Sequence, residues 1–135
     1  MFFILFFISL NISAQEIPDS PNAYDLDSNR IGLWTILFDS DWNSSDIIDS
    51  VTFYRIINYK KGVSSVKVTD FYLNGNKQFE GNILSDKQED IYFGKCEWFS
   101  ENGDVIEKRI INEKTSEHFH YDQKKLLLKF LLEYD

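Results

Sequence analysis

Two histidines near the end of the chain have the spacing of a metal-binding pair. His118 and His120 are the only histidines in the sequence, and they flank Phe119. Residues i and i+2 of a β-strand lie on one face, so both imidazoles could approach one ion. The nearest carboxylate along the chain, Glu117, would point to the other face. We expect a solvent-facing pair instead, and no metal ligand is assigned.

An acidic segment, "DSDWNSSD", resembles the first half of a calcium-binding loop. Asp39, Asp41 and Asn43 place side-chain oxygens at its first, third and fifth positions. An EF-hand loop needs glycine at the sixth position and glutamate at the twelfth, but this chain has Ser44 and Ser50 there. We therefore expect a solvated turn held by side-chain-to-backbone hydrogen bonds.

Groups suited to catalysis form no recognised pattern. Glu97, Glu101 and Glu107 could supply paired carboxylates for glycoside chemistry, but acidic β-proteins commonly contain such pairs. There is no Ser-His-Asp arrangement, phosphate loop or zinc-protease motif. Cys96 lies within a strand-like pattern and is expected in the core. We therefore expect a non-enzymatic protein with no catalytic, cofactor-binding or metal-binding residues and no cofactor.

Strands are the elements that must position these side chains. Aromatic residues make up 16% of the chain, which favours strands over helices. Runs with strand-like composition or alternation cover residues 32–38, 51–59, 65–72, 77–84, 91–99 and 104–111. The last segment, 117–135, could form a hairpin about Asp122 to Lys125, or its "LLLKFLLEYD" could form a short helix. The prediction is an all-β antiparallel meander of about seven or eight strands.

Asn74-Gly75 is the strongest turn signal in the chain. Both central residues of a type I′ turn need positive φ, which asparagine and glycine tolerate. We therefore predict a type I′ hairpin at this point.

An aromatic–glycine pattern recurs along the chain. The segments "NYKKG", "FYLNG" and "FSENG" each place an aromatic residue three or four positions before a glycine. The pattern predicts stacked hairpins in which Tyr72 and Phe99 are equivalent, buried ring positions. A single hairpin cannot bury its own face, so neighbouring copies must cover it.

This pattern resembles the MORN repeat, and specifically the divergent MORN-variant proteins of bacteria, which are often labelled antitoxin-like. The matching residues are "DSNRIGLW" (Asp27 to Trp34), "FYLNG" and "WFSENG", and the resemblance covers Asp27 to Ile111. It implies an open, elongated sheet of stacked hairpins that acts by contact with another protein or as a structural module. The alternative is a small lipocalin-like barrel binding an apolar ligand, because "GLW" at Gly32 and "TDFY" at Thr69 resemble lipocalin signatures.

The N-terminal residues have the pattern of a secretory signal. Phe2 to Leu10 is apolar except for Ser9, and small and polar residues follow up to Ala14. Such a run is too short to span a bilayer as a helix. We predict a signal peptide over residues 1–14, a flexible arm over 15–30 and a single β-repeat domain over 31–135. The protein would then be periplasmic, outer-surface or secreted.

The charge distribution restricts the partners. The net charge is −8, and residues 15–50 hold eight acidic residues against Arg30 alone. An acidic surface disfavours nucleic acid and anionic lipid. Exposed aromatic side chains could instead bind a protein; the candidates are Tyr54, Tyr72, Tyr92, Trp98 and Phe99. Since core packing is the favoured explanation for each of these residues, no site residue is assigned, and the expected partner is another protein.

Overall fold

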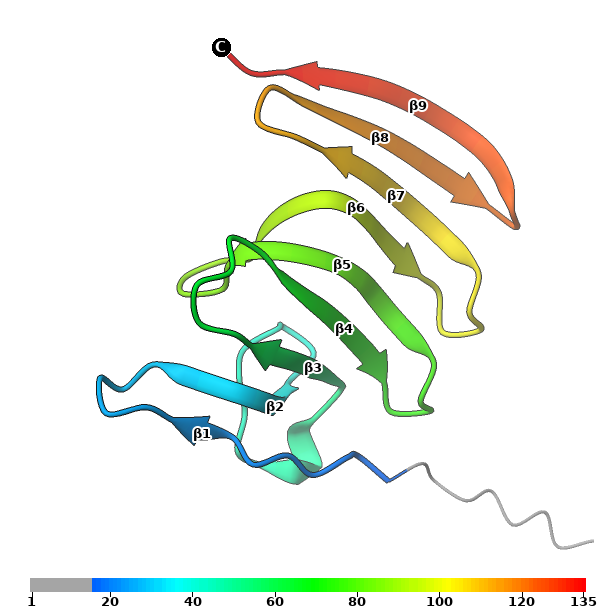
Figure 1. Ribbon diagram of the computed structural model, residues 1–135. Coiled ribbons are helices and arrows are strands. Elements are labelled where there is room, and N and C mark those ends of the chain that lie inside the picture. Colours follow the sequence, from blue (N-terminus) through cyan, green and yellow to red (C-terminus); the bar gives the residue numbers. More distant parts are fainter. Residues whose placement is uncertain (1–15) are drawn as a thin grey trace, which may run out of the picture.

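The structure is a computed structural model that describes residues 16–135, so the predicted signal peptide and its cleavage point lie outside the described residues. It forms one antiparallel sheet in which nine strands follow sequence order (Figure 1). The strands are β1 Ala23–Tyr24, β2 Arg30–Phe38, β3 Phe53–Tyr59, β4 Val66–Tyr72, β5 Lys77–Ser85, β6 Ile91–Phe99, β7 Val105–Ile111, β8 Thr115–Asp122 and β9 Lys125–Glu133. One turn of 3-10 helix, Ile48–Ser50, lies between β2 and β3.

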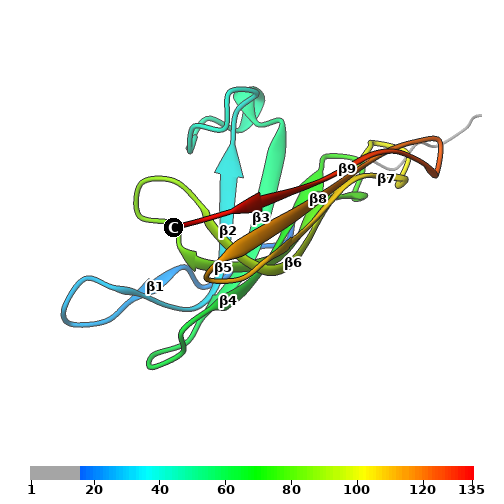
Figure 2. The same cartoon turned by 90° about the horizontal axis from the view of Figure 1, so that it is seen from above.

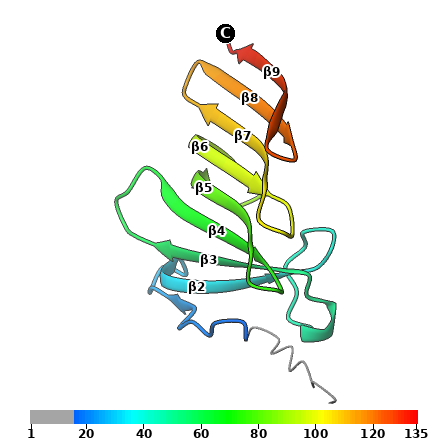
Figure 3. The ribbon, with the colours of Figure 1, turned by 90° about the vertical axis from the view of Figure 1, so that its right-hand side faces the viewer.

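The predicted fold class, an all-β antiparallel meander, is confirmed. The sheet has nine strands where seven or eight were expected, and β1 is only two residues long. The C-terminal segment, which the sequence left open between strand and helix, forms the hairpin β8–β9. In the described residues β1 and β9 lie at opposite ends of the sheet (Figure 1), which stays open in the side view (Figure 3), so the closed barrel of the alternative interpretation does not form.

The segment predicted as a flexible arm contacts β2. Asn22 exchanges two hydrogen bonds with the backbone of Thr35, through Oδ1 at 2.9 Å and Nδ2 at 3.1 Å. The indole of Trp34 donates to the Ala23 carbonyl oxygen at 3.1 Å. β1 lies within this segment, and the division into an arm and a repeat domain stays a prediction.

Within residues 16–135, one turn type occurs four times. In each copy the first residue donates its N–H to the fifth residue's carbonyl, and the fourth residue, at positive φ, donates to the first residue's carbonyl. This is a type I turn followed by a G1 bulge. The copies are Asp25–Asn29, Asp39–Asn43, Tyr72–Asn76 and Ser100–Asp104, and an aromatic residue precedes each: Tyr24, Phe38, Phe71 or Phe99.

The type I′ prediction at Asn74-Gly75 is wrong. Gly75 has φ of 85°, whereas Asn74 is absent from the positive-φ residues, because the loop has three residues and needs only one left-handed position. Two consecutive residues with positive φ occur instead at Gln123 (45°) and Lys124 (67°), which join β8 to β9.

The predicted equivalence of Tyr72 and Phe99 is also wrong. The turn hydrogen bonds align Tyr72 with Ser100, so the equivalent of Phe99 is Phe71. Tyr72 and Phe99 are both half-buried rather than buried. The two turns are nevertheless neighbours, because the Tyr72 hydroxyl donates to the Phe99 carbonyl oxygen at 2.7 Å.

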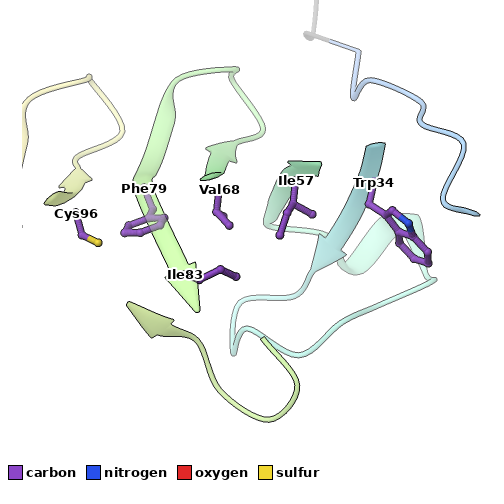
Figure 4. Packing of buried hydrophobic residues seen from close by; sticks show 6 residues of the cluster. All are labelled: Trp34, Ile57, Val68, Phe79, Ile83 and Cys96. Carbon is purple, nitrogen blue, oxygen red and sulfur yellow. The ribbon is translucent and has the colours of Figure 1, made fainter. Parts of the chain in front are cut away.

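The core is a row of side chains that crosses the strands on one face. Trp34, Ile57 and Val68 are directly paired on β2, β3 and β4, and Cys96 continues the row on β6 (Figure 4). Phe79 and Ile83 of β5 flank the row. Between Val68 and Cys96, β5 contributes Gly81, whose missing side chain leaves room for the Cys96 thiol.

The same row continues beyond the core and becomes polar. Cys96 pairs with Arg109, Arg109 with His118, and His118 with Phe130 of β9. Viewed from above, the sheet twists, so β2 and β3 run at a large angle to β8 and β9 (Figure 2). The buried apolar cluster lies on β2 to β6, and the C-terminal strands extend past it.

Candidate functional site

A buried ion cluster joins β3, β4 and the segment before β6. Arg55 donates to both oxygens of Asp70, at 2.7 and 2.9 Å, and to both oxygens of Asp90, at 2.8 and 2.5 Å. Burial raises the pKa of Asp70, while the bonds from Arg55 oppose that rise. Because every Arg55 nitrogen is used between two carboxylates, we interpret the cluster as a structural cross-link.

A polar hollow of about 750 Å³ opens beside this cluster. Trp42, Tyr92 and Trp98 line it together with the acids Asp86 and Asp90. Trp42 has φ of 63°, unusual for a large residue, and its ring stacks on Phe53 with centroids 4.3 Å apart and planes 7° apart. The lining therefore combines aromatic rings with charged groups of both signs, and its buried cation, Arg55, is already paired.

The calcium-like segment forms the second of the four equivalent turns. Asp39 Oδ1 accepts the N–H groups of Asp41 and Asn43 at 2.9 and 3.0 Å, and these bonds lower the pKa of Asp39. The carboxylate thus holds the turn through Asx bonds, as expected from the sequence.

The three candidate glutamates are not brought together. Glu107 lies opposite Trp98 on the core face, whereas Glu97 is on the other face and contacts Lys95 at 2.9 Å. Glu101 is exposed in a turn. Cys96 is fully buried, as predicted, and burial raises the pKa of its thiol. These groups form no arrangement suited to acid–base or nucleophilic catalysis.

The aromatic residues considered for a binding surface do not form one exposed patch. Tyr54 is buried, and Tyr92 and Trp98 pack against the core cluster. Tyr72 and Phe99 are half-buried beside the turns. Core packing therefore accounts for most of these rings.

The histidine pair is joined by a carboxylate that the sequence did not indicate. Glu107 of β7 lies directly opposite His120 of β8, on the same face as His118. Their ligand atoms all lie within 4.8 Å of one another. His118 is buried, so the expectation of a solvent-facing pair is wrong for this residue. The register of the β7–β8 hairpin is the signal that could have identified Glu107.

Strand β9 exposes apolar side chains along its length. All nine of its residues are exposed, on both faces. Its large apolar side chains are between 36% and 63% exposed; they are Leu126, Leu127, Leu128, Phe130, Leu131 and Leu132. One edge of β9 pairs with β8, and in the described residues no strand pairs with its other edge. Such an edge is a template for another strand.

No known protein family, no curated protein and no solved structure matches this chain. Within residues 16–135, no helix has the length and apolar character to cross a membrane.

Proposed function

We propose that this chain is an exported, non-enzymatic β-repeat protein that acts as an interaction and structural module, similar to the divergent MORN-variant proteins. The observation that carries the proposal is the apolar strand β9, all nine residues of which are exposed. The recurring aromatic-preceded turns support the repeat relationship, and the apolar run from Phe2 to Leu10 supports export. N-terminal sequencing of the exported form is expected to begin at Gln15; a retained leader would contradict export.

The two edges of the sheet differ in a way that favours β9 as the docking strand. β1 has two residues, and the preceding segment continues to contact β2 through Asn22. β9 has nine residues and carries leucines on both faces. Natural edge strands are usually short, charged or covered, so a long apolar one indicates a binding function.

The occupant we assign to this edge is β9 of a second copy. The strand reads "KLLLKFLLE", with Lys125 and Glu133 each four residues from the central Lys129. In an antiparallel pair about a two-fold axis at Lys129, Lys125 of each copy faces Glu133 of the other. Leucines and Phe130 then face one another between these charges, which is the cross-strand arrangement that stabilises sheets.

The central lysines do not prevent this pairing. Lys129 Nζ lies 3.8 Å from Glu117 Oε1 and 5.0 Å from the centroid of the Phe119 ring. Both partners are on β8 of its own chain, so each ammonium group is held away from the symmetry axis. The two like charges are thereby partly compensated before the copies meet.

Sedimentation of the purified protein tests the proposal. The unchanged protein is expected to be a dimer that dissociates on dilution. Leu131→Lys, which puts a charge opposite Leu127 of the second copy, is expected to give a monomer. Leu73→Lys, at an exposed turn leucine, is the matched control and is expected to leave the dimer intact. A monomer at every concentration, or a dimer unaffected by Leu131→Lys, would overturn the self-pairing. The binding partner of β9 would then be a different protein.

A further inference from the structure

A compact group of ligand-type side chains lies on the core face where the apolar row ends. β7 and β8 place Glu107 opposite His120 and Arg109 opposite His118. The two imidazoles and the carboxylate come within 4.8 Å of one another. Two imidazole nitrogens and one carboxylate oxygen form a ligand set that transition metals accept.

The His118 ring is oriented by a buried hydroxyl. Ser116 Oγ lies 2.8 Å from His118 Nε2, and His118 Nδ1 lies 3.8 Å from Glu107 Oε1. When Nε2–H donates to Ser116, Nδ1 keeps its lone pair directed toward Glu107. Metal-binding histidines commonly have such a partner on the second ring nitrogen.

Phe130 of β9 packs against both imidazoles. Its ring lies 4.6 Å from the His118 ring and 5.7 Å from the His120 ring, with interplanar angles of 20° and 13°. The aromatic ring restricts both histidine side chains, so they lose less conformational entropy when a ligand binds.

The positive charge of Arg109 opposes a cation at this position. Its Nε donates to Glu107 Oε1 at 2.5 Å, and its guanidinium carbon lies 4.6 Å from the Trp98 ring centroid. The contact with Trp98 holds the guanidinium to one side, and Glu107 Oε2 receives no bond from it. Carboxylates that bind metals often accept such an outer hydrogen bond.

We propose that Glu107, His118 and His120 bind one divalent transition-metal ion, such as Zn²⁺, with water completing its coordination. Hard cations such as Mg²⁺ prefer oxygen ligands and should not bind. The ion would link β7 to β8 immediately beside β9, and would stabilise the folded protein by mass action.

Zn²⁺ titration of the purified protein, prepared without a polyhistidine tag, tests the site by calorimetry. One equivalent is expected to bind, and Mg²⁺ is expected to give no signal. Glu107→Gln and His120→Asn should each weaken binding by more than about 100-fold, and Ser116→Ala by about 10–100-fold. Glu97→Gln, on the opposite face of β6, is the matched control and should leave the affinity unchanged.

Histidine NMR signals of the unchanged protein keep the test independent of variant folding. Because the chain has only two histidines, their imidazole resonances report this site alone. Saturation with Zn²⁺ is expected to shift both rings and to raise the melting temperature. Unmoved imidazole signals, or equal weakening by Glu97→Gln and Glu107→Gln, would overturn the proposal.

Discussion

The Tyr72 hydroxyl donates a hydrogen bond to the Phe99 carbonyl oxygen at 2.7 Å, linking two equivalent turns from neighbouring hairpins. The side-chain amide of Asn76 adds a second link, to the Glu101 carbonyl at 2.7 Å. The two hairpins are therefore joined by side-chain hydrogen bonds at their turns as well as by backbone pairing along their strands.

Removing the Tyr72 hydroxyl tests how much the hydrogen bond between the turns contributes to stability. Tyr72→Phe is expected to cost about 0.5–1.5 kcal/mol in the free energy of unfolding, because the Phe99 carbonyl loses its partner. Tyr134→Phe, at an exposed tyrosine, is the control and should cost nothing measurable. Urea unfolding measures both variants, and equal stabilities would mean that the link contributes nothing.

The left-handed fourth position of the repeated turn has a predictable cost. Gly103→Ala should destabilise by about 1–2 kcal/mol, because φ is 93° while nothing lies within 4 Å of the added Cβ. The entire loss is then backbone strain. Ser28→Gly, at the same turn position with φ of 62°, should instead increase the stability of the fold. Thermal unfolding that shows both variants losing stability would contradict the shared turn geometry.

Gly81 is required by packing rather than by its backbone angle. A Cβ there would lie 2.7 Å from both Cys96 Sγ and Phe79 Cζ. Gly81→Ala should therefore cost about 1–3 kcal/mol from overpacking. Combining it with Cys96→Ala should recover part of the loss, and strictly additive losses in denaturant unfolding would refute the contact.

Two tyrosines should make the fold less stable at alkaline pH. Burial raises the pKa of Tyr59 to about 12, assisted by its bond to Asp86, and burial also raises the pKa of Tyr92 to about 12. The ordinary tyrosine value is 10.0, so the folded state retains protons that the unfolded state releases between these values. Stability should then fall as pH rises from 10 to 12.

Tyr59→Phe isolates one of these two contributions. The variant should lose stability less steeply with pH above 10 than the unchanged protein, as measured by urea unfolding at several pH values. An identical pH dependence in both proteins would show that Tyr59 titrates normally in the fold.

The strands were predictable from residue types, because strand-like composition and alternation reflect one buried sheet face. The turn at Gly75 was located correctly but assigned the wrong type, since two-residue and three-residue loops share the Asn-Gly signal. The choice of strand for β9 depends on pairing with β8, which residue types alone do not contain.

The side-chain clusters were not predictable because they depend on register. Arg55 meets Asp70, and Glu107 meets His120, only because these residues pair across neighbouring strands. A shift of one residue would send each side chain to the opposite face. The exposed β9 edge was visible only as an apolar run, equally consistent with a helix until the hairpin is known.

A charge exchange on β9 tests the central claim, which is self-pairing of this strand. Lys125→Glu places acidic groups opposite Glu133 of the second copy, and Glu133→Lys places basic groups opposite Lys125. Each single variant should therefore sediment as a monomer at a concentration where the unchanged protein is a dimer. An equimolar mixture of the two variants restores opposite charges at both ends, and should sediment as a heterodimer. A mixture that stays monomeric, or single variants that dimerise as well as the unchanged protein, would contradict the account.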